Sequence, residues 1–409
     1  MKILFVNQKC GYFGGVEQNV ADTAEGLRLR GHQCFLVYGE RTNRNTFEYQ
    51  QLFTETFYCK ELMQNASQSN GERTRNQAPL SFKEILQSIS PDVVYFHKVP
   101  DMGEFVDSLH NVKTVRMIHD HDLCCPRRHK YFAKSEKVCT QPVSWRCFLD
   151  GAFLERAPKS LLGVKFVNIN KKINEMRRNY QFDTLLVGSR FMRDELLMNG
   201  FPSDRVFTLP PVVKAPVEKP MPVPKEKQIL YVGQLIRGKG VDLMLKALKK
   251  IRCDFTASLV GTGNAVVELE KLSRELGLGN RVKFRGWVNN SQLNMFYDAA
   301  KVVVVPSRWP EPFGMIGLEA MRHGRPVVGF AVGGIPDWLE QNSTGVLVPE
   351  QDTDAMATAI ERILINDELA TKYGYNAYQR YRSVYGFEDY LIQLESCLQV
   401  GKEALCPVI

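Results

Sequence analysis

Two glutamates stand in a segment whose residue types and spacing suit the binding of a sugar and a phosphate. Glu311 comes shortly after the valine run 302–305, and Glu319 comes shortly after Gly314. The valine run predicts a buried strand and the residues after Gly314 predict a helix, so the two carboxylates do not share one helix face. Carboxylate oxygens accept hydrogen bonds from hydroxyls. We interpret Glu311 as a ligand of sugar hydroxyls and Glu319 as a ligand of ribose hydroxyls; the alternative is two ordinary solvated glutamates.

The predicted start of that helix supplies a place for phosphate. Backbone amides at a helix start lack partners within the helix and attract anions. In open α/β sheets, ligands lie beyond the carboxyl ends of the strands, where this loop falls. The residues whose backbone amides we expect to bind an anion such as a diphosphate are Phe313, Gly314, Met315 and Ile316.

A second segment predicts a strand, a glycine-bearing loop and a helix start, and it carries cations. A phosphate-bearing ligand needs positive charge near it. Arg237 and Lys239 could supply that charge, with Gly233 and Gln234 beside them in the same segment. The alternative is a solvated basic turn.

Two further loops follow predicted strands in the same half of the chain. Gly261 and Gly263 could lie against the nucleotide, and the backbone of Trp287 and Val288 could contact the edge of its base. Either loop alone is typical of an ordinary turn. Their order along the chain is what favours a nucleotide site.

The first half of the chain offers polar residues at the ends of two predicted strands. Gly14 and Gly15 join the first strand to the first helix, where a phosphate or sugar could approach closely; a flexible surface turn is the alternative. His119, Asp120 and His121 follow the predicted strand 114–118. A single histidine is usually structural, but the carboxyl end of a central strand favours contact with a ligand.

The elements that must hold these residues alternate along the chain. Short apolar runs separated by helical patterns predict parallel sheets covered on both faces. A proline-rich stretch between 210 and 224 interrupts the alternation and predicts a linker. A chain of 409 residues suits two domains. We therefore expect an α/β protein with two Rossmann-like doubly wound domains that face a central cleft.

The segment from Ser307 to Glu319 resembles the glutamate–seven residues–glutamate signature of the GT-B retaining glycosyltransferases of family 4, the glycosyl transferases group 1. The likeness runs through the second half of the chain and, more loosely, the first. It implies that Glu311 and His119 contact the donor sugar and that Lys239 contacts the diphosphate.

The chain departs from that family in the basic loop. The family often has arginine directly after the first glycine, where this chain has Gln234, and we expect Arg237 to take its place. The resemblance also implies domain roles. These are an N-terminal acceptor-binding domain at 1–211, a linker at 212–224, a C-terminal nucleotide-sugar-binding domain at 225–384, and a helix at 385–409 that crosses back to the first domain.

The resemblance implies an enzyme, a retaining hexosyltransferase that needs no cofactor besides its donor. The donor is a nucleoside-diphosphate sugar, with a UDP-sugar favoured and a GDP-sugar also compatible. The acceptor is a hydroxyl of a carbohydrate, a glycolipid or a protein-linked glycan, in polysaccharide, glycolipid or glycoconjugate synthesis. Asp120 and His121 fall on the acceptor side. The alternatives are a sugar-nucleotide epimerase of similar architecture and a non-catalytic nucleotide-sugar-binding protein.

Cysteines and a carboxylate pair raise the question of a metal. Cys124, Cys125, Cys139 and Cys147 lie close in sequence but lack the usual zinc spacing, so we expect free thiols, with a site of three of them and one histidine as the alternative. Asp120 to Asp122 also reads as Asp-x-Asp, the metal motif of the other main glycosyltransferase fold. We discount it because the diphosphate already has a place in the second domain. No metal is therefore expected.

Composition and charge limit the surroundings of the protein. With 44% hydrophobic and 24% charged residues the chain is globular, and no apolar run is long enough to span a bilayer. We expect a cytoplasmic location. The net charge is +8. The basic stretch 155–180 with interleaved apolar residues could rest on the inner face of an anionic membrane, bind a phosphate of the acceptor, or be a solvated helix face. No aromatic–basic platform accompanies the charge, which argues against nucleic acid.

Overall fold

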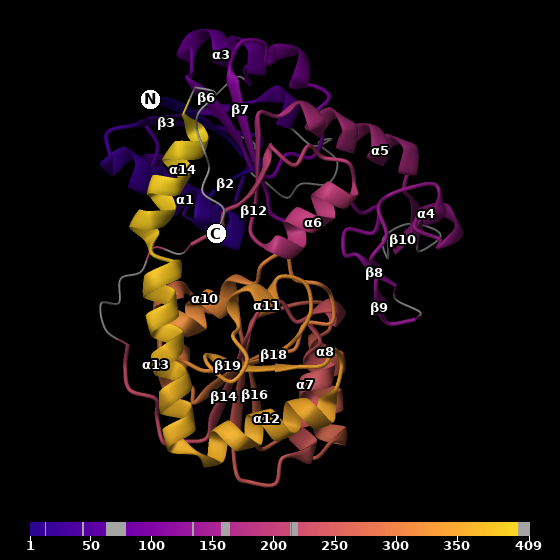
Figure 1. The fold of residues 1–409 in the computed structure, drawn as a ribbon, viewed down its shortest axis with the longest axis vertical. Helices are drawn as coiled ribbons and strands as arrows, with labels where there is room; N and C mark the ends of the chain where they lie inside the picture. The colour runs from indigo at the N-terminus through magenta and orange to yellow at the C-terminus, as the bar shows by residue number, and fades with distance from the viewer. Residues whose placement is uncertain are drawn as a thin grey trace. The chain divides into compact units, whose positions relative to one another are not determined.

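The structure is a computed structural model that describes residues 1–12, 14–42, 45–62, 79–132, 135–156, 164–212, 214 and 220–399. The chain forms two compact units, which are described separately (Figure 1). The first comprises Met1–Phe132, Cys139–Pro211 and Glu388–Ile409, and the second comprises Ala133–Val138 and Val212–Phe387.

The first unit is built on a parallel sheet whose central strands are almost wholly buried. Every strand pair in it is parallel. In spatial order the strands are β13 (Val206–Thr208), β12 (Thr184–Val187), β7 (Lys113–Ile118), β6 (Val93–Phe96), β1 (Lys2–Val6), β3 (Gln33–Tyr38) and β5 (Glu55–Tyr58). Because β1, β6 and β7 are neighbours, the loops after them emerge at one edge of the sheet.

Helices and small ribbons complete the first unit. The helices are α1 (Gly15–Leu29), α2 (Thr46–Gln51), α3 (Phe82–Ile89), α4 (Arg146–Leu149), α5 (Ile169–Arg178), α6 (Arg190–Met198) and α14 (Phe387–Leu398), with 3-10 turns η1 (Lys60–Leu62), η2 (Val106–Ser108) and η3 (Asn179–Gln181). Short strands are β2 (Lys9–Cys10), β4 (Glu40–Arg41), β8 (Tyr131–Phe132), β10 (Leu154–Arg156) and β11 (Val164–Phe166).

The last helix of the chain packs on the first one. Arg30 at the end of α1 donates two hydrogen bonds to the carboxylate of Glu395 in α14, at 3.0 and 2.8 Å. Deeper in the contact, the hydroxyls of Thr23 and Tyr390 lie 3.1 Å apart. Figure 1 shows α14 running beside α1. A charged rim and a buried polar contact thus attach the C-terminal helix to the first unit.

The second unit repeats the design with a parallel sheet of six strands. In spatial order they are β16 (Val282–Gly286), β15 (Thr256–Val260), β14 (Gln228–Val232), β17 (Val302–Val305), β18 (Val327–Phe330) and β19 (Gly345–Val348). All residues of β17 and β18 are buried, as expected for strands covered on both faces. A further short strand, β9 (Lys137–Val138), counts with this unit.

The helices of the second unit include the two that follow the candidate site loops. They are α7 (Val241–Lys250), α8 (Val266–Glu275), α9 (Asn290–Ala299), α10 (Met315–Arg322), α11 (Ile335–Trp338), α12 (Thr353–Ile365) and α13 (Asp367–Val384), with the 3-10 turn η4 (Arg237–Lys239) before α7. Helix α12 packs on α7, and α10 packs on α13. No helix among the described residues combines the length and the apolar character needed to cross a bilayer.

The predicted fold class is confirmed, since both units are doubly wound parallel sheets. The buried strand expected at 302–305 and the helix expected after Gly314 both appear, as β17 and α10. In the first unit the sequence analysis did not predict α2, α3, α4, α6 or the edge strand β5. The residues of β5 are only partly buried and follow no apolar run. The predicted bounds and roles of the domains stay predictions.

Two loops of the second unit are locked together at the carboxyl edge of its sheet. The backbone amides of Arg308 and Trp309 both donate to the carbonyl of Gly238, at 3.0 and 3.1 Å. A Cβ on Gly238 would lie 2.0 Å from the Trp309 ring, and one on Gly240 would lie 1.9 Å from the Pro306 carbonyl oxygen. Only glycine allows this approach, which fixes the loop carrying Lys239 against the loop carrying Glu311.

We expect Gly240→Ala to destabilise the second unit more than backbone strain alone explains. Gly240 has φ 66°, where a side chain costs about 1–2 kcal/mol, and the clash with Pro306 adds to that cost. Gly277→Ala is the matched control, because Gly277 has φ 72° and meets no atom closer than 3.8 Å. Chemical denaturation of both variants measures the difference. Equal losses of stability would contradict the locked-loop interpretation.

Candidate active site

Glu311 is the centre of a polar cluster at the carboxyl end of β17. The ammonium of Lys239 lies 2.7 Å from its Oε1 and 2.9 Å from its Oε2. The hydroxyl of Ser307 donates to Oε1 as well. Glu311 is buried, with 9% of its surface exposed, and Ser307 is more deeply buried. The structure therefore brings two predicted site residues, Glu311 and Lys239, into direct contact.

A glycine turn holds the backbone of Glu311. The carbonyl of Glu311 accepts a hydrogen bond of 2.7 Å from the amide of Gly334. A Cβ on Gly333 would stand 2.4 Å from the amide nitrogen and the carbonyl oxygen of Glu311. The carboxylate is thus positioned by its backbone on one side and by Lys239 and Ser307 at its tip.

The start of α10 lies directly after this cluster. Gly314 is the N-cap, with φ 95°, and no side chain caps the helix. The Trp338 indole donates to the carbonyl of Phe313 at 2.7 Å, and the Phe313 ring packs edge-on against Tyr385. Met315 and Ile316 are half-buried. The segment that we assigned to phosphate is therefore an anchored helix start whose first amides have no side-chain cap.

Glu319 lies one turn further into α10 and faces α9. Its Oε2 accepts a hydrogen bond of 2.6 Å from the hydroxyl of Tyr297. Burial raises the pKa of the Glu319 carboxyl, while the hydrogen bond from Tyr297 and the charge of Arg322 oppose that rise. Burial, followed by the neighbouring Glu319, raises the Tyr297 pKa well above its usual value. The tyrosine fixes one carboxylate oxygen of Glu319.

The side chains of Arg237 and Gln234 are more exposed to solvent than that of Lys239. Arg237 is exposed, and its guanidinium pairs with the carboxylate of Glu136 at 2.7 Å, both within the second unit. The Gln234 side chain is also exposed. The backbone carbonyl of Gln234 accepts a hydrogen bond of 2.8 Å from the Tyr231 hydroxyl. A further arginine, Arg308, is buried. Its guanidinium donates hydrogen bonds to the carboxylate of Asp242 and to the backbone carbonyl of Arg237, and these contacts stiffen the loop.

The glycines after β14 and β15 lie together, and their neighbours explain why they are glycine. A Cβ on Gly261 would lie 1.9 Å from the carbonyl oxygen of Gly233, and one on Gly263 would lie 2.2 Å from that of Leu235. The amide of Leu235 donates to the carbonyl of Thr262 at 2.9 Å. The two loops are therefore packed backbone to backbone, a requirement of the fold that exists without any ligand.

Trp287 and Val288 follow β16, the edge strand of the second sheet. Trp287 is exposed and Val288 is half-buried. Since β16 pairs with β15, the loop after β16 emerges beside the one that carries Gly261 and Gly263. The structure thus places the base-contacting candidates next to the nucleotide loop expected for them.

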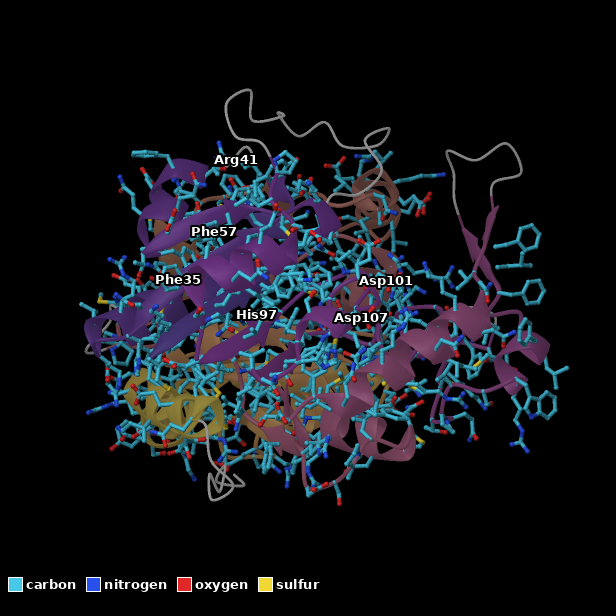
Figure 2. The ribbon with its side chains drawn as sticks, turned by 90° about the horizontal axis from the view of Figure 1, so that it is seen from above. Phe35, Arg41, Phe57, His97, Asp101 and Asp107 are labelled. Carbon is cyan, nitrogen blue, oxygen red and sulfur yellow. The ribbon has the colours of Figure 1, made fainter. Side chains whose placement is uncertain are left out.

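In the first unit, His119 is paired with a histidine that the sequence analysis did not select. His97 follows β6, is almost fully buried, and its Nδ1 lies 3.0 Å from Nε2 of His119, which follows β7. The His97 ring stacks on Phe5 with an interplanar angle of 6°. Figure 2 shows His97 among the side chains of the first unit. The packed His97 ring therefore orients the His119 ring.

Burial keeps both imidazoles uncharged. It lowers the pKa of His119 to about 4, with the charges of Lys98 and Arg116 lowering it further and Asp120 raising it. Burial, together with the neighbouring His119, also holds the His97 pKa well below its usual value. At neutral pH one ring can donate a hydrogen bond to the other, and the His119 ring is uncharged.

Asp120 is part of an ion pair beside that histidine. The ammonium of Lys98 lies 2.9 Å from Asp120 Oδ2, and the amide of Asp122 donates to Oδ1 at 2.9 Å. Burial by itself raises the Asp120 pKa, but Lys98 and the Asp122 amide bring it below its usual value. Asp120 is therefore an anion with both oxygens engaged.

The remaining first-unit candidates differ in their exposure. His121 is buried, and its ring meets the Phe191 ring of α6 edge-on at 5.8 Å, as a packing residue does. Gly14 is the extended N-cap of α1 and Gly15 is its first residue, without a side-chain cap. Glu17, in the first turn of α1, is buried and burial raises its pKa. Its carboxylate adds an acidic group that the sequence analysis did not weigh.

Four cysteines of the first unit line one small cavity. Cys124, Cys125, Cys139 and Cys147 surround a space of about 20 Å³ and carry free thiols. Burial raises the pKa of Cys124 and of Cys125. Among the residues that the structure describes, no three histidine, cysteine, aspartate or glutamate side chains are arranged to hold a metal ion.

Sequence reasoning missed His97, Ser307 and Tyr297, each of which holds a predicted residue. Ser307 and His97 directly follow buried strands or lie near their carboxyl ends, and this position is the signal that could have drawn attention to them. Tyr297 lies on α9, far from Glu319 in sequence, and nothing local marks it. Within the second unit the structure brings Glu311 into contact with Lys239, and within the first unit it brings His119 into contact with His97.

Two family models match successive parts of the chain. The model described as Glycosyltransferase Family 4 matches residues 13–215, and the model described as Glycosyl transferases group 1 matches residues 217–380. Together they include almost every candidate residue in both units.

Curated relatives match a part of this chain. An uncharacterized glycosyltransferase of Methanocaldococcus jannaschii is 40% identical over 141 residues, which is 34% of this chain and 36% of the relative. An alpha-D-kanosaminyltransferase of Streptomyces kanamyceticus is 34% identical over 36% of this chain and 39% of its own length. The match thus spans little more than a third of either relative.

Solved structures resemble the whole chain. HepE of Anabaena, in complex with UDP and glucose, has a TM-score of 0.70 at 20% identity, covering 97% of this chain and 99% of that one. Sucrose-phosphate synthase of Thermosynechococcus elongatus has a TM-score of 0.71 at 21% identity, covering 96% and 97%. At these identities the likeness establishes the fold, which is GT-B.

We expect the Lys239–Glu311 contact to be worth more than a surface ion pair. Lys239→Met leaves a buried carboxylate without its cation and should lower the free energy of unfolding by roughly 1–3 kcal/mol. Adding Glu311→Gln to the Lys239→Met variant removes the uncompensated negative charge and should recover part of the lost stability. A double-mutant cycle measures the coupling. Strictly additive effects would show that the two groups do not depend on each other.

The histidine pair predicts a loss of stability in mild acid. Below a pH of about 6.5 the unfolded chain binds protons at both rings. In the folded chain the His119 ring stays neutral until about pH 4, and burial holds the pKa of His97 well below its usual value as well. The free energy of unfolding should therefore fall between these values. His97→Phe keeps the ring shape and should make the fall smaller, measured by thermal melts from pH 7 to 4.5. The exposed His110, replaced by Asn, is the control that should leave the slope unchanged; an unaltered slope in His97→Phe would argue against buried neutral rings.

Proposed function

Because the chain belongs to the family 4 glycosyltransferases, we propose that it transfers a hexose from a nucleoside-diphosphate sugar to an acceptor hydroxyl with retention at the anomeric carbon. The family supports the transfer of a sugar. Retention, the hexose and the pathway, which would be polysaccharide, glycolipid or glycoconjugate synthesis, are our extension of it.

One observation carries the proposal: the Glu311 carboxylate, held by Lys239 and Ser307 at the carboxyl end of β17. Charged side chains are mostly exposed in proteins, so the burial of the Glu311 carboxylate sets this ion pair apart from ordinary surface contacts. Sugar hydroxyls can replace the lysine at the carboxylate, because a carboxylate has room for several donors. Lys239 would then turn its charge toward the diphosphate. We propose that Glu311 binds the donor sugar and that Lys239 connects sugar and phosphate.

The leaving diphosphate would find its positive charge in the protein itself. Lys239, Arg237 and the uncapped start of α10 supply cations and amides near one another. Arg237 would exchange its partner Glu136 for phosphate. We propose that these groups serve in place of a metal ion and that no cofactor besides the donor is required.

We propose that Glu319 binds the ribose and that the loop with Trp287 and Val288 contacts the base. Tyr297 occupies one oxygen of Glu319, which leaves the other for a ribose hydroxyl. UDP-sugars are the favoured donors, because the HepE structures contain UDP or UDP-glucose. A relative in Mycobacterium tuberculosis, 29% identical over 44% of this chain, is named as GDP-mannose-dependent, which keeps a GDP-sugar as the second choice.

The first unit would supply the acceptor side, with His119 contacting the donor sugar through its neutral ring. Asp120 and the glycine turn at Gly14 and Gly15 lie at the same edge of the sheet as His119. A carbohydrate, a glycolipid or a protein-linked glycan would serve as the acceptor. We also propose a cytoplasmic protein in peripheral contact with the inner face of an anionic membrane, which fits the basic stretch 155–180 of the sequence.

We expect a UDP-sugar to raise the melting temperature of the full chain, since a ligand of the folded state stabilises it. Glu311→Gln keeps the shape of the side chain and should keep the shift caused by UDP. It should lower turnover of the UDP-sugar at least about 100-fold, the loss typical of one well-placed electrostatic group. Glu275→Gln, on the exposed surface of α8, is the matched control and should do neither.

Product analysis with a labelled donor separates the alternatives. Without acceptor, a transferase should release free sugar slowly, whereas an epimerase would return an interconverted nucleotide sugar. A protein that binds UDP but never turns over a donor would contradict the enzymatic proposal. Unchanged turnover in Glu311→Gln would remove Glu311 from it.

A further inference from the structure

The first unit exposes large apolar side chains on α4 and on the hairpin of β10 and β11. Trp145, Leu149 and Phe166 are 64%, 76% and 69% exposed, and Phe148 and Leu154 are also exposed. Single apolar residues on a surface are ordinary, but several adjacent ones mark a place of contact. We call these five residues the α4–hairpin surface.

The members of this surface are connected. Ring centroids of Phe148 and Phe153 lie 6.2 Å apart, and the Phe153 and Phe166 rings are nearly parallel at 6.4 Å. In the antiparallel pairing of β10 and β11, Leu154 stands directly opposite Phe166. Cross-strand neighbours share one face of the ribbon. Phe153 thus connects the helix to the hairpin.

Helix α4 presents its apolar residues on one side. Trp145 and Leu149 are four residues apart, and Phe148 is three residues after Trp145, spacings that put side chains on the same face of a helical turn. The backbone continues the contact, since the amide of Ala152 donates to Cys147 and that of Val167 donates to Phe153. The apolar residues therefore belong to one supported projection of the first unit.

The sequence that contains this surface is basic. Between residues 145 and 172 it has six basic residues against the two acids Asp150 and Glu155; the basic residues are Arg146, Arg156, Lys159, Lys165, Lys171 and Lys172. Arg146 is exposed within α4 itself, between Trp145 and the other apolar residues. Helix α5 begins three residues after Phe166, and Lys171 in its first turn is exposed.

We propose that the α4–hairpin surface docks on an anionic lipid bilayer. Tryptophan and phenylalanine beside arginine and lysine are typical of segments that lie in the membrane interface. Each basic residue near an anionic surface adds attraction. A protein partner is the less favoured occupant, because lysine is depleted at protein interfaces whereas Lys171 and Lys172 lie in the first turn of the neighbouring helix α5.

This inference rests on the membrane contact included in the proposed function, but it assigns that contact to residues other than the face of α5. In α5, Arg178 is engaged with Asp101 and Glu175, and Lys171 pairs with Asp101. The part of the basic stretch at 157–163 lies outside the described residues. The apolar insertion needed for docking comes from Trp145, Leu149 and Phe166.

The test is co-sedimentation of the full chain with vesicles, without donor or acceptor. We expect binding to vesicles of phosphatidylcholine with about 30% phosphatidylglycerol, because basic residues are attracted to anionic lipid. Binding to vesicles of phosphatidylcholine alone should be weaker. Replacing both Trp145 and Leu149 by serine should weaken binding at least about tenfold, because two buried apolar side chains are lost. Arg146→Glu should weaken only the part that depends on phosphatidylglycerol.

Matched controls come from the same unit. Leu29 and Phe47 are 77% and 73% exposed on α1 and α2, so the double replacement by serine removes similar apolar area elsewhere and should leave binding unchanged. Melting temperatures verify that all variants fold. Wild-type tryptophan fluorescence should shift to shorter wavelength with anionic vesicles.

Three results would overturn the proposal. The wild-type chain could fail to bind the vesicles, both double variants could bind equally, or light scattering could show a dimer that the Trp145 and Leu149 replacements dissociate. The last result would make a second copy of the chain the occupant. Because no donor is present, each result leaves the transferase proposal to its own test.

Discussion

The contact between Lys239 and Glu311 is the constraint on which the second unit's candidate site depends. A carboxylate with so little exposed surface needs a cation or donors, and Lys239 and Ser307 provide them. The contact requires the two loops to meet, and they meet only because Gly238 and Gly240 admit Trp309 and Pro306. The buried pair, the backbone packing of the two loops and the position of the helix start are thus linked to one another.

The first unit satisfies its buried polar groups differently. Here burial favours neutral rings, and His97 with His119 forms an uncharged pair at the ends of β6 and β7. Beside it, Asp120 stays ionised because Lys98 is within contact distance. One edge of the sheet therefore carries a neutral hydrogen-bonding group and a compensated anion next to each other. The two units share a topology, but they present different chemistry at the edges of their sheets.

The sequence predicts the second unit well because its strands are short, wholly apolar and regularly separated by helices. It predicts Glu311 and Lys239 from their positions after such strands. It does not predict their contact, since the distance between them depends on loop packing across 72 residues. Edge strand β5 fails for the opposite reason: its half-buried residues lack an apolar run. Gly261 and Gly263 look like ligand loops in sequence, yet backbone packing alone already requires glycine there.

The locked loops after β14 and β17 have a consequence for redesign. Neither can be exchanged for a loop of another sequence by itself, because a side chain at Gly238 or Gly240 would displace the partner loop and a smaller residue at Trp309 would leave the other unsupported. The two loops therefore form a single structural module. Replacing the sequence of either loop means moving residues 233–240 and 306–314 as one block.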